Sequence, residues 1–330
     1  MTFLAYRVEE AEQGMVASWQ EQDVTDLPEG EVLIDVEYSS INYKDALSAS
    51  GNKGVTREFP HTPGIDVAGT VVESSAEGFS AGDPVVVFGY DLGMNTAGGF
   101  AQKVRVPAAW VLKRPTDLSA AQAMSWGTAG FTAALSVQKL ERNGINPDSG
   151  PIVVTGATGG VGSVAVAILA KLGYEVLAVT GKPEQQEFLK SLGANGFLTR
   201  DDILATKGKA MAKPVYQAAI DTVGGDLVSG LIPQIKPEGA VTTCGMIAGI
   251  KVEASVFPFI LRGVSLLGVD SVEIPLAEKQ AVLNKAAAEW QLDQLESMTT
   301  ELGRSKLADT LAKVLNGQGV GRYRLNLQAD

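Results

Sequence analysis

The segment Thr155-Gly156-Ala157-Thr158-Gly159-Gly160-Val161-Gly162 decides the fold of this 330-residue chain. It follows a short apolar run, Ile152–Thr155, which predicts a buried strand. It leads into Val161–Leu172, whose apolar spacing predicts a helix that ends at Gly173. Glycine has no Cβ, so the backbone can turn tightly here and come close to a phosphate group. The N–H groups of the first helical turn then face that negative charge.

Short apolar runs and helical stretches alternate from Pro151 onward. Further strands are predicted at Glu175–Val179, Ala218–Asp221, Ala240–Cys244 and Val264–Val269, and a further helix at Pro183–Leu192. This βαβ alternation predicts an α/β fold with a doubly wound parallel sheet. In that setting the spacing Ala157-x-Gly159-x-x-Gly162, with Ala in the first place, indicates a dinucleotide-binding turn.

The end of the second strand distinguishes two dinucleotides. A protein that binds NAD has Asp or Glu at the end of this strand, about 20 residues after the glycine turn, where its carboxylate bonds the ribose 2′-hydroxyl. Here the strand ends in Thr180-Gly181-Lys182, with no acid before Glu184. Thr180 and Lys182 can donate to a 2′-phosphate, and Arg200, after the next predicted strand, adds a second cation. Each cation alone is typical of a solvated surface, but together they favour NADP(H) over NAD(H).

The flanking sequence has a different character. Strands are predicted at Glu31–Tyr38, Ile65–Glu73, Val85–Tyr90 and Phe100–Val106, a helix from Ser119 towards Leu140, and, past Pro275, two helices and a strand at Arg322–Leu327. We therefore predict two domains. Residues 1–123 and 270–330 form a β-rich domain that the C-terminal tail rejoins, and residues 124–269 form the nucleotide-binding domain.

Composition excludes several classes of protein. The 27 basic and 38 acidic residues give a net charge of −11, which disfavours nucleic acid and anionic membranes as partners. The sequence shows neither a signal peptide nor an apolar run long enough to cross a bilayer. Its one cysteine, Cys244, permits no internal disulfide, so we expect a cytoplasmic protein.

The small number of Cys and His residues also argues against a zinc site. Zinc in oxidoreductases is held by Cys, His and carboxylate ligands, and a structural zinc commonly takes four cysteines. This chain has one Cys and one His, His61, so we expect no metal. Cys244 is interpreted as a small core residue and His61 as a loop or pocket-lining side chain. A Ser-His-Asp or Cys-His hydrolase would have to use this one His and is not expected.

Together these motifs resemble the medium-chain dehydrogenase/reductase superfamily in its zinc-independent, quinone-oxidoreductase-like branch. The resemblance is carried by Ser40-Ile41-Asn42-Tyr43-Lys44-Asp45, Pro63-Gly64-Ile65-Asp66-Val67-Ala68-Gly69, Gly82-Asp83-Pro84-Val85, Gly98-Gly99-Phe100-Ala101 and the Gly156–Gly162 turn. Zinc alcohol dehydrogenases have Pro-Gly-His-Glu in the second motif. Ile65 replaces that ligand His, in agreement with the metal argument.

Several segments are similar to NADPH-dependent acrylyl-CoA reductases. They are Asn42–Leu47, Gly127–Ala133, Ala219–Gly224, Pro258–Arg262 and Gly268–Val272. The resemblance implies a GroES-like catalytic domain, a Rossmann domain and a homodimer. It also implies cofactor contacts at Tyr43, Thr158, Gly159, Gly160, Val161, Thr180, Gly181, Lys182, Arg200, Met246, Ile260, Ser271 and Gly317. For Met246 and Ile260, simple packing is the alternative interpretation.

The implied reaction is reduction of acrylyl-CoA to propionyl-CoA by NADPH. Tyr43 is the one residue nominated as proton donor, and orientation of the nicotinamide is its alternative role. Coenzyme A carries phosphates, for which Lys53, Arg57 and Arg262 are the candidate cations or, alternatively, ordinary surface residues. Two other functions stay open: an NADPH-dependent quinone or general enone reductase, and an NADPH-binding protein without turnover.

Overall fold

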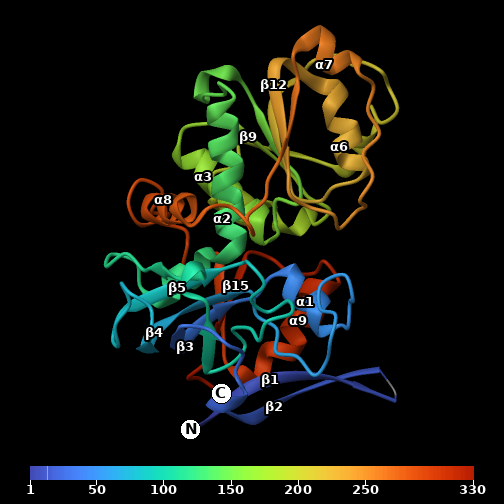
Figure 1. Ribbon diagram of the computed structural model, residues 1–330. Coiled ribbons are helices and arrows are strands. Elements are labelled where there is room, and N and C mark those ends of the chain that lie inside the picture. Colours follow the sequence, from blue (N-terminus) through green and yellow to red (C-terminus); the bar gives the residue numbers. More distant parts are fainter. Residues whose placement is uncertain (13) are drawn as a thin grey trace. The chain divides into compact units, whose positions relative to one another are not determined.

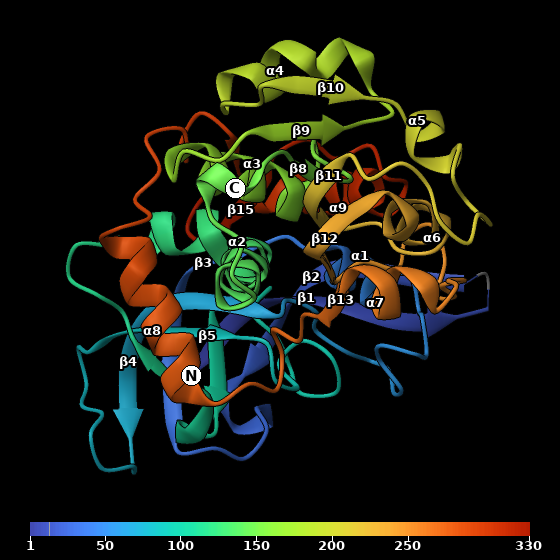
Figure 2. The same ribbon diagram turned by 90° about the horizontal axis from the view of Figure 1, so that it is seen from above.

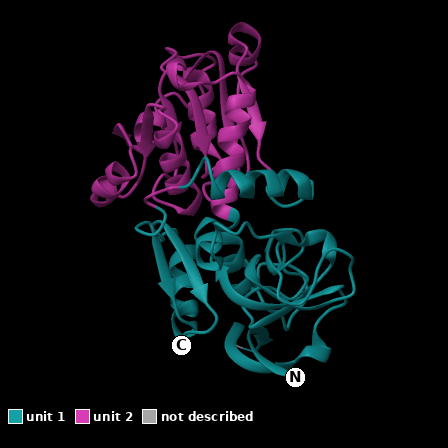
Figure 3. Ribbon diagram, turned by 90° about the vertical axis from the view of Figure 1, so that its left-hand side faces the viewer, with its two compact units in different colours: residues 1–128, 271–291, 295–330 teal, residues 129–270, 292–294 magenta. Residues whose placement is uncertain are grey.

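The computed structural model describes residues 1–12 and 14–330, which form two compact units (Figure 3). Unit 1 comprises Met1–Thr128, Ser271–Gln291 and Leu295–Asp330, and unit 2 comprises Ala129–Asp270 and Leu292–Gln294. The sequence placed the domain boundaries at 123/124 and 269/270. The first boundary in the structure falls inside helix α2 (Ala120–Arg142), just beyond a kink at Gly127 (φ 50°, ψ −170°). Ser119 caps this helix, because its Oγ accepts the N–H of Gln122.

Unit 2 is the predicted α/β domain. Its elements are β8 (Ile152–Val154), α3 (Gly160–Lys171), β9 (Val176–Val179), α4 (Gln186–Ser191), β10 (Gly196–Leu198), α5 (Arg200–Leu204), β11 (Tyr216–Asp221), α6 (Asp226–Leu231), β12 (Ile235–Thr243), α7 (Phe257–Arg262) and β13 (Ser265–Gly268). All strand pairs are parallel, in the order β10-β9-β8-β11-β12-β13, which Figure 2 follows from one edge to the other. The prediction of a doubly wound parallel sheet is confirmed.

Local signals set the ends of these elements correctly. Gly173 (φ +85°) follows α3, and Gly193 (φ +101°) follows α4, as a left-handed residue after a helix does. The central strand β8 is wholly buried, which a parallel sheet covered on both faces requires. The apolar side chains of β11 and β12 pack with those of α6 in one buried cluster.

Unit 1 is built on a seven-stranded sheet. Its elements, most of which Figure 1 labels, are β1 (Thr2–Ala11), β2 (Gly14–Asp23), β3 (Val32–Ser40), α1 (Tyr43–Ala49), β4 (Asp66–Ser74), β5 (Pro84–Phe88), β6 (Lys103–Val106), β7 (Leu112–Lys113), the start of α2, α8 (Leu276–Ala287), β14 (Thr299–Leu302), α9 (Leu307–Leu315) and β15 (Arg322–Asn326). The strand order is β14-β15-β3-β4-β5-β7, with β6 also paired to β3. Because β15 pairs with β3, the C-terminal tail belongs to this unit.

Two predicted strands in unit 1 were too long. Strand β5 ends at Phe88 and not at Tyr90, because Gly89 (φ +72°) and Tyr90 (φ +53°) turn the backbone into the left-handed region. Strand β6 starts at Lys103 and not at Phe100, because the carbonyl of Phe100 is taken by the N–H of Tyr6 in the β1–β2 hairpin. That hairpin was not predicted from the sequence.

Among the residues that the structure describes, no helix combines the length and apolar character needed to span a bilayer.

Gly69 allows β3 and β4 to pair closely. A Cβ at this position would lie 1.9 Å from the backbone oxygen of Asp35. We therefore expect Gly69→Ala to lower the free energy of unfolding by about 1–3 kcal/mol, the usual cost of overpacking. Gly319→Ala is the control, because its Cβ would meet only ordinary contacts, Tyr323 Cε2 at 3.5 Å being the nearest. Thermal unfolding of both variants measures this, and a Gly69→Ala melting temperature equal to wild type would contradict it.

Candidate functional site

The glycine turn of unit 2 depends on the absence of Cβ atoms. A Cβ on Gly162 would lie 2.3 Å from the carbonyl oxygen of Gly156, so the first turn of α3 can approach β8 only with glycine there. Gly156 itself has φ +58°, and a Cβ on it would lie 2.5 Å from Thr222 Oγ1. The turn is therefore as tight as the sequence predicted, and this cradle fits the pyrophosphate of a dinucleotide.

Helix α3 begins at Gly160 with Gly159 as its N-cap, a residue with no side chain to cap the first turn. The N–H groups of that turn thus stay available to a ligand, together with the positive end of the dipole of a twelve-residue helix. Thr158 is buried, whereas Gly159, Gly160 and Val161 are half-buried. These four predicted contacts form one continuous turn.

Asp221, whose role the sequence analysis missed, holds the strand ends around this turn. Its carboxylate accepts hydrogen bonds from Thr155 Oγ1 at the end of β8 (2.7 Å) and from Thr243 Oγ1 at the end of β12 (3.0 Å). It also accepts the N–H of Gly224 at 2.8 Å. Burial raises the pKa of Asp221, and these donors oppose the rise. The signal was present, since Asp221 ends a predicted strand inside a motif shared with the reductases.

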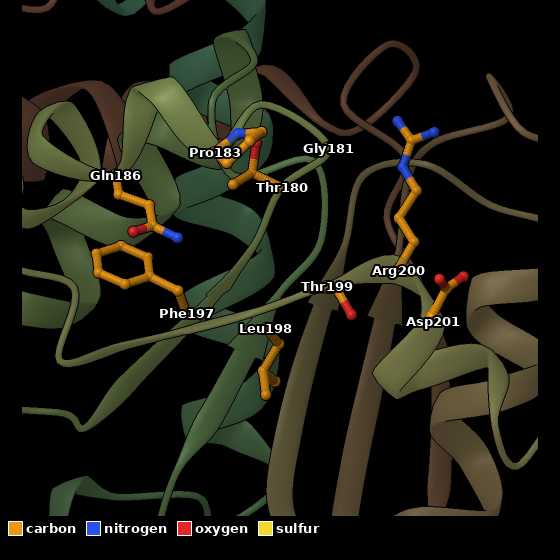
Figure 4. A pocket seen from close by; sticks show the side chains of 9 residues that line it. All are labelled: Thr180, Gly181, Pro183, Gln186, Phe197, Leu198, Thr199, Arg200 and Asp201. Carbon is orange, nitrogen blue, oxygen red and sulfur yellow. The ribbon is translucent and has the colours of Figure 1, made fainter.

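A pocket of about 380 Å³ opens beyond the ends of β9 and β10 (Figure 4). It is lined by Thr180, Gly181, Pro183, Gln186, Phe197, Leu198, Thr199, Arg200 and Asp201. Three predicted site residues, Thr180, Gly181 and Arg200, thus share one pocket. Figure 4 shows the Arg200 side chain extending from α5 towards the loop at Gly181. A Cβ on Gly181 would lie 3.3 Å from the Arg200 guanidinium, so the cation packs against bare backbone.

The two predicted cations are electrostatically coupled. Burial lowers the pKa of Lys182, the charge of Arg200 lowers it further, and Glu184 opposes both effects. Two cations held within interaction range disfavour each other and favour an anion between them. Asp201, a carboxylate that the sequence argument left out, also lines the pocket. It is the residue here that could bond a ribose hydroxyl.

In unit 1, Tyr43 opens helix α1 and is half-buried. The helix start is fixed by a capping box in which Asp45 accepts the N–H of Asn42 at 2.8 Å. Asp45 also accepts the N–H of Ile65 at 2.9 Å. Burial, reinforced by the charge of Asp66, raises the pKa of Asp45 to about 7. Tyr43 is therefore held at the end of a rigid, buried polar cluster.

Asp66, next to the position of the missing zinc ligand, has its hydrogen-bonding capacity filled. It accepts from Ser40 Oγ, from Asn42 Nδ2 at 2.9 Å, and from both the N–H (2.8 Å) and Oγ1 of Thr128. The fully buried Arg322 supplies the counter-charge, and burial lowers its pKa to about 10. This donor set ties β3, β4 and α2 together and does not fit a zinc ligand set.

Cys244 and His61 lie in different units. Cys244 follows β12 and is half-buried, whereas the sequence suggested a small core residue. Burial raises the pKa of its thiol to about 12, and the thiol donates to the carbonyl of Asp221 at 3.4 Å. His61 is buried, and its backbone pairs with Val8. Within residues 1–12 and 14–330, no three His, Cys, Asp or Glu residues are grouped as a metal site would require.

The remaining predicted cofactor contacts differ in exposure. Met246 and Ile260 are 54% and 68% exposed, so they are not core packing residues. Ser271 is buried, at 8% exposure, at the start of the segment that leads to α8. Gly317 is exposed at the end of α9 with φ +67°, a helix-ending conformation.

The three cations suggested for coenzyme A are not equivalent. Arg262 is excluded as a phosphate ligand, because its guanidinium donates to the carbonyls of Ala212, Pro233 and Ile235 and so joins the end of α7 to the start of β12. The ammonium group of Lys53 pairs with Glu10 and donates to the carbonyl of Arg57. Arg57 is exposed in unit 1 and remains the better candidate.

A parallel sheet with a phosphate-binding turn, joined in one chain to a β-rich unit, defines a two-domain nucleotide-binding protein. Two family models match it: the alcohol dehydrogenase GroES-like domain at residues 28–116 and the zinc-binding dehydrogenase domain at residues 160–288. The chain is 44% identical to acrylyl-CoA reductase AcuI of Ruegeria pomeroyi over 95% of both chains. It is also 44% identical to putative quinone oxidoreductase YhfP of Bacillus subtilis over 92% of both. The chain belongs to the medium-chain dehydrogenase/reductase family and is an oxidoreductase.

Solved structures agree with this assignment. The yhdH oxidoreductase of Salmonella enterica in complex with NADP is 40% identical, with a TM-score of 0.95 over 99% of this chain and 100% of that one. Bacillus subtilis yhfP with NAD bound is 41% identical, with a TM-score of 0.96 over the same shares. These relatives confirm a GroES-like domain joined to a Rossmann domain.

Proposed function

We propose that this chain is an NADPH-dependent reductase of the C=C bond of enoyl thioesters and converts acrylyl-CoA to propionyl-CoA. The substrate follows from the similarity to AcuI over nearly the whole chain. The cofactor follows from one observation in the site: Arg200 packs on Gly181 with Lys182 in electrostatic range. A cation that follows β9 (Lys182) and one that follows β10 (Arg200) match a 2′-phosphate.

The residues of unit 2 fit the cofactor at two points. The Gly156–Gly162 turn and the first N–H groups of α3 would hold the pyrophosphate. Thr180, Lys182 and Arg200 would hold the 2′-phosphate through charge-assisted hydrogen bonds. In unit 1, Tyr43 and Ser271 are the proposed contacts.

When bound, the reduced nicotinamide supplies a hydride to the β-carbon of the alkene. The chain itself must orient the thioester and deliver a proton to the α-carbon. The phenol of Tyr43 is proposed as that donor and takes a replacement proton from water. Holding the reacting groups in place lowers the barrier by about 7–11 kcal/mol at best.

We further propose that the reaction needs no zinc. This rests on the residues present: one Cys and one His in the whole sequence, Ile65 in place of the ligand His, and an Asp66 carboxylate occupied by four donors. Polarisation of the thioester oxygen then falls to hydrogen-bond donors of the protein.

A quinone is the second candidate substrate, because YhfP is as similar in sequence as AcuI and bears the name of a quinone oxidoreductase. The same hydride chemistry serves both substrates. A quinone carries no phosphate, however, so it would need no cation such as Arg57.

We also propose that the protein is a homodimer, with no nucleic acid or membrane as partner, and that it acts in the cytoplasm. In the described part of the chain, β13 is an edge strand of the unit 2 sheet. Exposed apolar side chains gather on it and on the residues before it: Phe257, Leu261 and Leu266 are 45%, 66% and 40% exposed. An apolar edge strand is a template for pairing with a second copy.

Cofactor preference depends on Arg200. We expect Arg200→Ala to raise the dissociation constant for NADPH about 10- to 100-fold, the loss of one charge-assisted hydrogen bond, with little change for NADH. Lys171→Ala, which removes an exposed cation at the C-terminal end of α3, is the matched control and is expected to leave NADPH binding unchanged. Fluorescence titration with both nucleotides measures this. NADH binding to wild type as tight as NADPH binding would contradict the assignment.

Substrate and proton donor are tested by the loss of NADPH absorbance across acrylyl-CoA, longer enoyl-CoAs and benzoquinone. We expect the highest kcat/KM on acrylyl-CoA, and a Tyr43→Phe variant at least about 100-fold slower in kcat. A higher kcat/KM on benzoquinone would favour the quinone function. NADPH binding without turnover on any substrate would show a binding protein. Near-normal turnover of Tyr43→Phe would leave hydride transfer intact and exclude Tyr43 as the donor.

Assembly is tested by light scattering after gel filtration. We expect wild type at twice the chain mass and Leu266→Lys at the mass of one chain, because a charge on the apolar edge strand opposes pairing. Val16→Lys changes an apolar residue of unit 1 that is more exposed, at 55%, and should leave the dimer intact. A monomeric wild type, or a dimeric Leu266→Lys, would contradict the proposal.

A further inference from the structure

Lys279, in the second turn of α8, is a lysine with no exposed surface. Lysine is almost never fully buried unless its charge has partners, because removing an ammonium group from water is costly. Its Nζ donates to the carbonyl oxygens of Phe88 and Val272, each at 2.7 Å. It also lies 3.3 Å from the centroid of the Tyr90 ring, a close cation–π contact.

These three contacts join two segments that are far apart in the sequence. Phe88 ends β5 and Tyr90 follows it, whereas Val272 lies in the segment by which the chain enters unit 1 after Asp270. The lysine therefore fastens the end of β5 to residues 271–274.

Other contacts support the same junction. The N–H of Tyr90 donates to the carbonyl of Val272 at 3.4 Å, and Tyr90 Oη donates to Ile274 O at 3.4 Å. Tyr90 is held by stacking on Trp110, with ring centroids 5.6 Å apart and planes 10° apart. Tyr90 also has φ +53°, which is uncommon for a non-glycine residue and is kept only where the surroundings enforce it.

The backbone approach at this junction is close. A Cβ on Gly89 (φ +72°) would lie 3.2 Å from the Cα of Val272 and 3.4 Å from the carbonyl oxygen of Ser271. The backbone of Ser271 thus packs against Gly89. The carbonyl of the next residue, Val272, accepts a hydrogen bond from Lys279. A displacement at Val272 must move Ser271 as well, because consecutive Cα atoms are about 3.8 Å apart through a planar peptide.

We propose that Lys279 is a positioning residue for the cofactor, which acts through Val272 to hold Ser271 in place. The inference rests on the proposed function, in which Ser271 contacts NADPH. Lys279 itself touches neither substrate nor cofactor. Its ammonium group takes the place of water as the hydrogen-bond donor to the carbonyls of Phe88 and Val272. Because Val272 is held in this way, the neighbouring Ser271 is held in position to contact the cofactor.

The test compares Lys279→Met, which keeps the length of the side chain and removes the ammonium group, with Lys285→Met. Lys285 is on the same helix and also lies over an aromatic ring, that of Trp290 at 4.7 Å. We expect Lys279→Met to raise the NADPH dissociation constant about tenfold at a temperature well below its unfolding transition, and Lys285→Met to leave it unchanged. An unchanged dissociation constant, with only a lower melting temperature, would reduce Lys279 to a stability role and overturn the proposal.

A double-mutant cycle with Ser271→Ala tests the route. If Lys279 acts through Ser271, the double variant binds NADPH no more weakly than the weaker of the two single variants. If the fold-increases of the two single variants in the NADPH dissociation constant multiply in the double variant, the coupling is overturned.

Should Lys279→Met fail to fold, Gly89→Ala is the second variant, because its Cβ presses on Val272 while Lys279 is intact. We expect the same weakening of NADPH binding. Wild type that binds no NADPH would refute the proposed function instead, so the two failures are distinguishable.

Discussion

The approach of helix α3 to strand β8 is the constraint on which the nucleotide site depends. Gly162 lies so close to the glycine turn that a Cβ on it would be 2.3 Å from the carbonyl oxygen of Gly156. That closeness directs the N–H groups of the helix start towards the ends of the parallel strands. Asp221 then fastens β8 and β12 at the same edge through Thr155 and Thr243. The proposed phosphate-binding site thus depends on glycine geometry and on one buried carboxylate.

Buried charge has a common use in this molecule. Asp66 with Arg322, Asp221 with its threonines, and Lys279 with two carbonyls each join chain segments that are distant in sequence. Each is costly to bury and is stabilised by several hydrogen bonds at once. Because their hydrogen bonds are directional, such groups determine how strand ends and loops meet. Hydrophobic packing alone determines this less strictly. The proposed contacts Tyr43 and Ser271 lie beside two of these clusters.

Local patterns made much of the fold predictable. The glycine turn, the parallel strands and the helix ends at Gly173 and Gly193 depend on residues close together in the chain, so sequence reasoning found them. The sequence could place Lys182 and Arg200 near each other because strand ends in a parallel sheet meet at one edge, and Arg200 does lie against Gly181.

Residues whose partners are distant were missed. Lys279 contacts a carbonyl 191 positions earlier in the chain, which no local pattern encodes. Arg262 was kept among the candidate cations for the same reason: the carbonyls that occupy its guanidinium belong to Ala212, Pro233 and Ile235, which are distant in sequence. Asp201 was passed over because the expected place for a carboxylate was the end of β9, and it reaches the pocket from α5.

A crystal structure of this chain soaked with NADPH tests the central claim most directly. The account predicts a pyrophosphate against the N–H groups of the Gly156–Gly162 turn and a 2′-phosphate within hydrogen-bonding distance of Arg200 and Lys182. Density for the nucleotide elsewhere, with the glycine turn empty, would contradict it.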